Sequence, residues 1–232
     1  MTLRALVSGY YGYGNAGDEA VLAGMIEALK AHGTLPVVIS GDPAATEALH
    51  GVRAVGRSGP RALARELGRA DLLISGGGGL IQDRTSRRSA LYYLGVIGLA
   101  RALGVGTYLY AQGVGPVTTR TVRAAARLVL PGVLGAGARD EASARTLVDL
   151  GVDPDRVRVT ADAAFALPPV DREEAERALA SAGVPGGGPR IGLIWRPPAA
   201  RRRRPSLLAR LPERRPPAAE DRGRSLAPGR TA

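Results

Sequence analysis

The sequence has 232 residues, of which 45% are hydrophobic and only 4% aromatic, so a sizeable core has to be built from Ala, Val, Leu and Ile. The absence of cysteine excludes disulfides, thiolate-bound zinc or iron–sulfur clusters, and a cysteine nucleophile. Neither a leader nor an apolar run of membrane-spanning length is recognisable, which predicts a cytoplasmic protein.

The net charge of +11 is unevenly distributed along the chain. Residues 196–232 contain eleven arginines against Glu213, Glu220 and Asp221, a net charge of +8, which leaves only +3 for residues 1–195. The basic pI therefore belongs to the C-terminal segment, and the body of the chain is not expected to bind nucleic acid specifically.

Predicted strands and helices alternate along the chain. Short apolar runs bounded by turn residues predict strands at 3–9, 36–40, 52–55, 71–75, 106–112, 133–138, 157–165 with its exit loop, and 190–195. Apolar residues at helical spacing predict helices at 20–33, 44–49, 60–67, 91–103, 119–130, 139–151 and 171–182. The alternation predicts an α/β fold with a doubly wound, Rossmann-like parallel sheet that binds ligands at the carboxyl ends of its strands.

Four consecutive glycines, Gly76 to Gly79, follow the strand at 71–75 without a break. Such glycines either let a ligand approach main-chain N–H groups or make a tight turn from a strand into a helix. Four in a row exceed what a turn needs, which favours the ligand.

Other strands also end in polar or glycine-rich loops, and a parallel sheet places all these loops on one edge. The first loop lacks the spacing of a G-x-G-x-x-G dinucleotide fingerprint, so the prediction depends on several loops together. They favour a crevice for a polar, anionic ligand, with no metal or cofactor. The candidate substrate-binding residues are Gly12, Gly14, Asn15, Gly17, Gly76, Gly77, Gly78, Gly79, Gln82, Gln112, Gly113, Gly115, Arg139 and Arg196.

Six motifs occur in a fixed order: GYYGYGNAGDE at 9–19, SGGGGLIQD at 75–83, LYYL at 91–94, YAQGVGP at 110–116, RDEAS at 139–143 and TAD at 160–162. Together they resemble the polysaccharide pyruvyl transferase family over residues 3–197, most closely its bacterial cell-wall branch. The resemblance implies a two-domain glycosyltransferase-B-like architecture, of which this chain holds the first half. It also implies transfer of a pyruvyl group from phosphoenolpyruvate to a sugar of a cell-wall polysaccharide, forming a ketal.

The partners that the resemblance implies are phosphoenolpyruvate and a glycan or lipid-linked saccharide acceptor, with a peripheral contact to the inner membrane face left open. In the family, the groups that grip phosphoenolpyruvate and a histidine proposed as the acid lie largely in the second domain. His32, beside a helix-ending glycine, and His50, before a short strand, are both expected on the surface.

Asp18, Asp83 and Asp162 are the candidate catalytic residues, as a base or as contacts to acceptor hydroxyls, because each follows a strand end. Asp18 is equally explained as a helix-capping acid. We expect Asp83→Asn to lower pyruvyl transfer without unfolding the protein. Arg139 and Arg196 either bind an anion or form exposed salt bridges.

Three tyrosines in the first loop, Tyr10, Tyr11 and Tyr13, either stack on sugars or fill space near the crevice. Asp140 and Glu141 are typical acids of a first helical turn.

The family pattern ends after Pro197, where seven prolines, many arginines and few large apolar residues predict a disordered tail. We divide the chain into an N-terminal domain at 1–190, the first strand of a truncated second domain at 191–197, and the tail at 198–232. A frameshift near codon 198 is favoured over a purposeful basic arm, and resequencing the locus tests it.

With half of the crevice missing, the chain is expected to be inactive alone. Two alternatives stay open: a nucleotide-sugar-dependent glycosyltransferase of the same architecture, and a non-catalytic binding fragment. The sequence does not identify the glycan or the oligomeric state.

Overall fold

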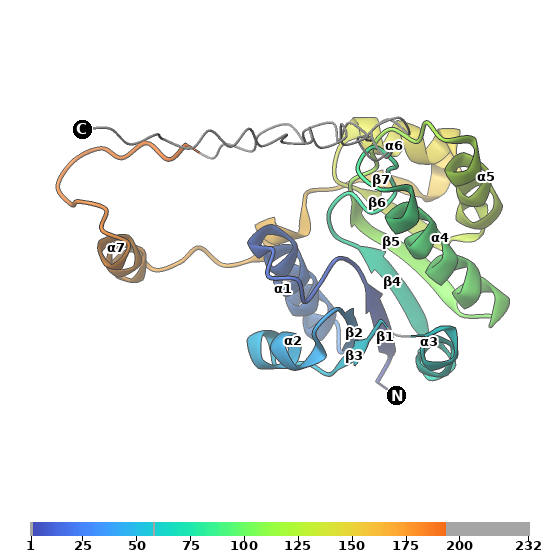
Figure 1. Ribbon diagram of the computed structural model, residues 1–232, viewed down its shortest axis with the longest axis horizontal. Helices are drawn as coiled ribbons and strands as arrows, with labels where there is room; N and C mark the ends of the chain where they lie inside the picture. Colours follow the sequence, from blue (N-terminus) through green and yellow to red (C-terminus); the bar gives the residue numbers. More distant parts are fainter. Residues whose placement is uncertain (1, 58, 194–232) are drawn as a thin grey trace, which may run out of the picture. The chain divides into compact units, whose positions relative to one another are not determined.

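The computed structural model describes residues 2–57 and 59–193 (Figure 1). The chain divides after Ala175 into two compact units. The first unit contains the whole sheet, and the second begins at Glu176, within the last helix. In the second unit, Arg190 forms a two-pronged ion pair with Glu176, with N–O distances of 2.9 and 2.8 Å.

The sheet has seven strands in the order β3-β2-β1-β4-β5-β6-β7, and every neighbouring pair is parallel. This confirms the predicted doubly wound α/β fold. The strands are β1 (Arg4–Ser8), β2 (Leu35–Ser40), β3 (Ala54–Gly56), β4 (Leu72–Gly76), β5 (Gly106–Gln112), β6 (Gly135–Ala138) and β7 (Val157–Val159).

Within the described residues, seven α-helices follow or connect the strands, and most of them begin where a side chain caps the first turn. The α-helices are α1 (Ala16–Ala31), α2 (Pro43–His50), α3 (Pro60–Leu67), α4 (Arg87–Ala102), α5 (Arg120–Val129), α6 (Glu141–Asp149) and α7 (Arg172–Ser181). The short 3₁₀ helices are η1 (Leu130–Gly132), η2 (Pro154–Arg156) and η3 (Ala163–Ala166).

Helix α4 begins at Arg87, one turn before the predicted start at residue 91. Ser86 explains the difference, because its Oγ accepts a hydrogen bond from the Ser89 N–H at 3.2 Å and so caps the helix. The prediction followed the apolar pattern and passed over this polar first turn.

Side chains alternate across the strands and build two core layers. Leu6 of β1 belongs to the same core cluster as buried residues of α4, α5 and α6, whereas its neighbours Ala5 and Val7 belong to a second cluster with residues of α1. Figure 1 shows α1 and α2 on one side of the sheet and α3, α4 and α5 on the other. Both faces of the sheet are therefore covered, as the uninterrupted apolar strands predict.

The order of the strands reverses between β1 and β4. The chain runs outward from β1 to β3, crosses back, and continues from β4 to β7, with Ser8 of β1 paired to Ser75 of β4. The loops after these two strands leave the same edge side by side, and such a switch point is where open α/β sheets bind ligands.

The predicted strand at 190–195 is not seen in its described part, residues 190–193. The remainder of that strand, Arg196 and the basic tail lie outside the described residues. Among the residues that the structure describes, no helix is long and apolar enough to span a bilayer.

Candidate active-site crevice

Tyr11 connects the loop after β1, residues 9–15, to the glycine run at residues 76–79. This side chain is completely buried, and its Oη donates a 2.6 Å hydrogen bond to the Gly76 carbonyl oxygen at the end of β4. Burial raises the pKa of Tyr11 far above its ordinary value, and nearby Asp18 adds to the effect. Tyr11 therefore stays protonated and joins two loops, so it fills space instead of stacking on a sugar.

Replacing Tyr11 by Phe leaves the Gly76 carbonyl without its donor. We expect Tyr11→Phe to lower the free energy of unfolding by about 1 to 2 kcal/mol, because a buried acceptor loses its partner. Urea unfolding followed by circular dichroism measures this change. Tyr13→Phe is the matched control, since Tyr13 is 46% exposed; equal losses in both variants would contradict the structural role of the Tyr11 hydroxyl.

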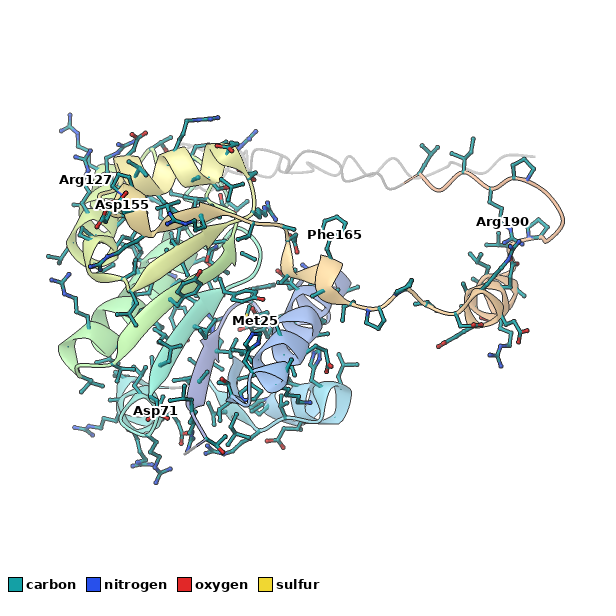
Figure 2. The ribbon with its side chains drawn as sticks, turned by 180° about the vertical axis from the view of Figure 1, so that it is seen from behind. Met25, Asp71, Arg127, Asp155, Phe165 and Arg190 are labelled. Atoms are coloured by element: carbon teal, nitrogen blue, oxygen red, sulfur yellow. The ribbon has the colours of Figure 1, made fainter. Side chains whose placement is uncertain are left out.

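Packing explains three of the four glycines in the run. A Cβ on Gly76 would lie 2.7 Å from Cε of Met25, which Figure 2 shows on α1. Gly77 and Gly78 have φ angles of +86° and +67°, and a Cβ on Gly78 would lie 2.9 Å from Oδ1 of Asp18. Gly79 has no positive φ, and its Cβ would come no closer than 3.7 Å to any atom. Gly79 is thus the glycine of the run for which packing gives no reason.

Asp18 lies in the first turn of α1, against the glycine run. Its carboxylate accepts a hydrogen bond from Asn15 Nδ2, and Asn15 Oδ1 accepts one from the Gly17 N–H at 3.2 Å. Gly14 has a φ of +68° and open space where a Cβ would be. Asn15 thus caps α1 and holds Asp18, so these two candidates of the first loop are in contact with one another.

Glu19 and His50 form a pair that the sequence does not predict. Glu19 Oε1 accepts a 2.8 Å hydrogen bond from the Gly12 N–H, and its Oε2 lies 2.9 Å from His50 Nε2. The His50 side chain is only 6% exposed, so the prediction that it lies on the surface is wrong. His32 is exposed, as predicted.

The loops after β4 and β5 pair with one another beyond the sheet. Gln112 is fully buried, and its Nε2 donates to the Gly78 carbonyl at 3.0 Å, while the Gly113 N–H donates to the same oxygen at 3.1 Å. A Cβ on Gly115 would lie 2.7 Å from Cβ of Gln82. Gly113 and Gly115 therefore permit close loop packing.

The side chain of Asp83 is hydrogen-bonded to the two residues that precede α5. Its carboxylate accepts hydrogen bonds from the Thr118 N–H at 3.0 Å, from Thr118 Oγ1 at 3.0 Å, and from the Thr119 N–H. Burial by itself would raise the pKa of Asp83, but the hydrogen bonds from Thr119 and Thr118 outweigh it and hold this pKa well below its usual range. A carboxylate of such low basicity is poorly matched to a general base.

Arg139 and Asp162 meet at the carboxyl edge of the sheet, after β6 and β7. Arg139 Nη1 lies 3.3 Å from Asp162 Oδ2, and its Nε lies 3.7 Å from an oxygen of Asp140. A Cβ on Gly113 would lie 2.5 Å from Nε of Arg139, so this glycine admits the guanidinium. Asp162 also caps η3, because Oδ1 accepts from the Ala164 N–H at 3.1 Å. Asp140 caps α6, and its hydrogen bonds from Ser143 lower its pKa.

Sequence reasoning missed Arg57, which follows β3 at the same edge. Its guanidinium carbon lies 4.1 Å from the centre of the Tyr92 ring, 5.5 Å from that of Tyr93 and 5.6 Å from that of Tyr13. Arg57 directly follows the end of a strand, and this position is what identified the other candidates in the sequence, so the same criterion could have identified Arg57. Within residues 2–57 and 59–193, no group of three His, Asp or Glu side chains is arranged to hold a metal ion.

Two solved structures of low sequence identity share the fold. A glycosyltransferase from Rickettsia africae is 14% identical with a TM-score of 0.51, and the match covers 81% of this chain and 51% of that one. HepE from Anabaena in complex with UDP-glucose is 12% identical with a TM-score of 0.52, covering 78% of this chain and 50% of that one. The chain thus spans about half the length of these proteins and is similar to them in fold alone.

A search of curated proteins finds no match. The family model described as polysaccharide pyruvyl transferase matches residues 15–218, which is most of the sequence. The five motifs from residue 75 onward lie within this range, and the first motif, at 9–19, lies partly within it. The chain therefore belongs to the polysaccharide pyruvyl transferase family.

Proposed function

We propose that this chain forms one wall of a crevice in which a pyruvyl group passes from phosphoenolpyruvate to a sugar of a cell-wall polysaccharide. Family membership supports the proposal, and one observation carries it to particular residues. Asp18, Gly78, Gly113, Arg139 and Asp162 form a continuous arc of contacts along the edge where such sheets bind ligands.

The reaction sets the chemical demands on this arc. A proton adds to the methylene carbon of phosphoenolpyruvate, one acceptor hydroxyl oxygen bonds to the central carbon, and a second hydroxyl oxygen displaces phosphate to close the ketal. Of the two hydroxyl protons released, one balances the new methyl group and the other leaves with the phosphate. A base near the hydroxyls and cations near the carboxylate and phosphate lower the barrier.

We assign to Asp18 and Asp162 the binding and deprotonation of the acceptor hydroxyl groups. Asp18 is half-buried at a helix N-terminus, where its negative charge is favoured, and it lies against the backbone of Gly78. Asp162 is oriented by Arg139, whose side chain is 40% exposed and carries donors suited to an anion. Asp83 instead positions the loop before α5, because its oxygens are taken by Thr118 and Thr119.

The other parts of the proposal follow from the family. The acceptor is a glycan or a lipid-linked saccharide, handled in the cytoplasm at the inner face of the membrane. Gly79, Gln82 and the first-loop residues Gly12 to Gly17 line the crevice. The activity of the whole enzyme requires the opposite wall, so the chain by itself is expected to bind substrate and not to turn it over.

Substitution of Asp18 tests the assignment. We expect Asp18→Asn to lower pyruvate incorporation into a cell-wall glycan by about 100-fold in a frame-restored version of the chain. The reason is that a positioned general base typically raises a reaction rate by at least about this factor. The assay follows labelled phosphoenolpyruvate into the glycan.

Asp71→Asn is the control for Asp18→Asn, since Asp71 precedes β4 at the opposite end of the strand. Among the described residues, its side chain accepts a hydrogen bond only from the Arg4 N–H, at 2.8 Å. Full activity of Asp18→Asn would remove this residue from the mechanism. Transfer of a sugar from a nucleotide sugar, with no pyruvate incorporated, would favour a glycosyltransferase instead.

A further inference from the structure

Three tyrosines, Tyr13, Tyr92 and Tyr93, surround Arg57, and a fourth, Tyr10, stacks on Tyr13; we call these four residues the tyrosine cluster. Arg57 Nη1 donates a 2.6 Å hydrogen bond to Tyr13 Oη. The Tyr13 ring stacks on Tyr10 at 4.4 Å with an interplanar angle of 15°, and Tyr92 meets Tyr93 edge to face at 5.1 Å. The guanidinium is therefore held in one place by three rings and a hydroxyl group.

Arg57 has no acidic partner among the residues that the structure describes. Other arginines near the same strands have an acidic partner: Arg4, Arg53 and Arg69 all form ion pairs with Glu66. A half-buried guanidinium that is immobilised but not neutralised keeps a positive charge and N–H donors for an external anion.

The cluster lies at the switch point of the sheet. Arg57 follows β3, Tyr10 and Tyr13 belong to the loop after β1, and Tyr92 and Tyr93 belong to α4, which follows the glycine run after β4. Arg57 thus reaches from one edge strand of the sheet toward the junction of β1 and β4, where this fold places ligands.

Two hydroxyl groups of the cluster, those of Tyr92 and Tyr93, are buried without a hydrogen-bond partner among the described residues. Tyr93 is 1% exposed, and its Oη makes no hydrogen bond to any described residue. Burial raises the pKa of Tyr93 against the opposing effect of Arg57, with further contributions from Tyr92, Tyr13 and Asp18. Its hydroxyl is thus a neutral donor on a ring that lies beside Arg57.

We propose that Arg57 and the tyrosine cluster form a binding subsite for the phosphate or carboxylate group of a substrate. The Arg57 fork and the Tyr93 hydroxyl bind the anion, and the exposed Tyr10 and Tyr13 rings offer a face to an adjoining sugar ring. The inference rests on the proposed function only in naming the anion's source, which is the pyruvyl donor or a phosphate-linked saccharide acceptor.

Calorimetric titration of the 232-residue chain tests the subsite. The probes are inorganic phosphate, phosphoenolpyruvate, UDP-glucose and neutral glucose, at low ionic strength because charge pairing is screened by salt. We expect the anionic probes to bind to the wild type. We expect Arg57→Gln to lower the affinity for them about tenfold or more, because a charge-assisted hydrogen bond is lost. Arg61→Gln removes the same charge from an exposed position on α3 and should leave affinity unchanged.

Two further variants separate binding from folding. Arg57→Lys keeps the charge but loses the planar fork, so affinity should fall between those of the wild type and Arg57→Gln. Tyr13→Phe removes the hydroxyl group that accepts a hydrogen bond from Arg57, and it should lower the affinity for anions severalfold without changing the net charge. Preference for phosphoenolpyruvate over phosphate identifies the donor as the source, and preference for UDP-glucose identifies a phosphate-linked acceptor.

Equal affinity in the wild type and Arg57→Gln would overturn the inference, as would anion binding with no Kd below about 10 mM. Binding of glucose as tight as that of the anions would overturn it too. Anion binding that depends on Arg57, together with no pyruvate transfer by the frame-restored chain, would leave the subsite standing and reject the proposed function alone.

Discussion

Asp83→Asn should cost the protein about 2 to 3 kcal/mol of unfolding free energy at pH 7, because hydrogen bonds to a buried carboxylate are among the stronger ones and an amide accepts with only one oxygen. The carboxylate joins the end of the glycine loop to the first turn of α5, bonding Thr118 and Thr119. Urea unfolding measures the loss. The sequence-based expectation was that this variant would lower pyruvyl transfer without unfolding the protein, and the hydrogen bonds of Asp83 add an expected loss of stability to it.

The contribution of Asp83 also depends on pH in a defined direction. Hydrogen bonds hold the folded-state pKa of Asp83 well below its usual range, so the unfolded chain takes up the proton first as pH falls. The stabilisation is complete above about pH 5 and shrinks progressively below the ordinary Asp pKa of about 3.9. The difference between wild type and Asp83→Asn should therefore narrow between pH 4 and pH 2, as measured by unfolding at each pH.

Asp153→Asn is the matched control for Asp83. Asp153 also caps a short helix, but it is 49% exposed and accepts one 3.0 Å hydrogen bond from the Asp155 N–H. Its loss should stay below about 1 kcal/mol. Similar losses at the two positions, or a difference that does not change with pH, would contradict the role assigned to Asp83.

Gly77→Ala should destabilise the protein by about 2 to 4 kcal/mol, whereas Gly79→Ala, two residues away, should stay within about 0.5 kcal/mol of wild type. A Cβ on Gly77 would lie 2.6 Å from Tyr11 Oη and 2.7 Å from Val21 Cγ1, and its φ of +86° disfavours any side chain. The nearest atom to a Cβ on Gly79 is 3.7 Å away. Thermal or urea unfolding of the two variants measures the difference.

The same pair of variants separates packing from ligand binding. If Gly79 is kept small for a ligand, Gly79→Ala should fold like the wild type and yet weaken substrate binding. Equal stability of Gly77→Ala and the wild type would contradict the close packing of the run on Tyr11. Unchanged binding by Gly79→Ala would leave the run with a structural role alone.

Features that depend on residues close together in the sequence were predictable. Hydrophobic periodicity predicts the apolar strands and the helices between them. The alternation of strands and helices in turn predicts a parallel sheet. Because parallel strands end at one edge, Asp18, Gly78, Gly113 and Arg139 were expected to gather there, and they do. The boundary of α4 was wrong because a single capping residue, Ser86, outweighed the hydrophobic pattern.

Contacts between residues far apart in the sequence were decided only by the tertiary structure. Tyr11 reaches Gly76 across 65 positions, Asp83 reaches Thr118 across 35, and Glu19 reaches His50 across 31. Each partner has a plausible local role by itself, so no pattern along the chain distinguishes a packing glycine from a ligand-binding one, or a buried cap from a base. The sequence by itself determined the family, the sheet and its polar edge. Burial and three-dimensional proximity decided which polar groups on that edge have protein partners and which, like Arg57, have no acidic partner among the described residues.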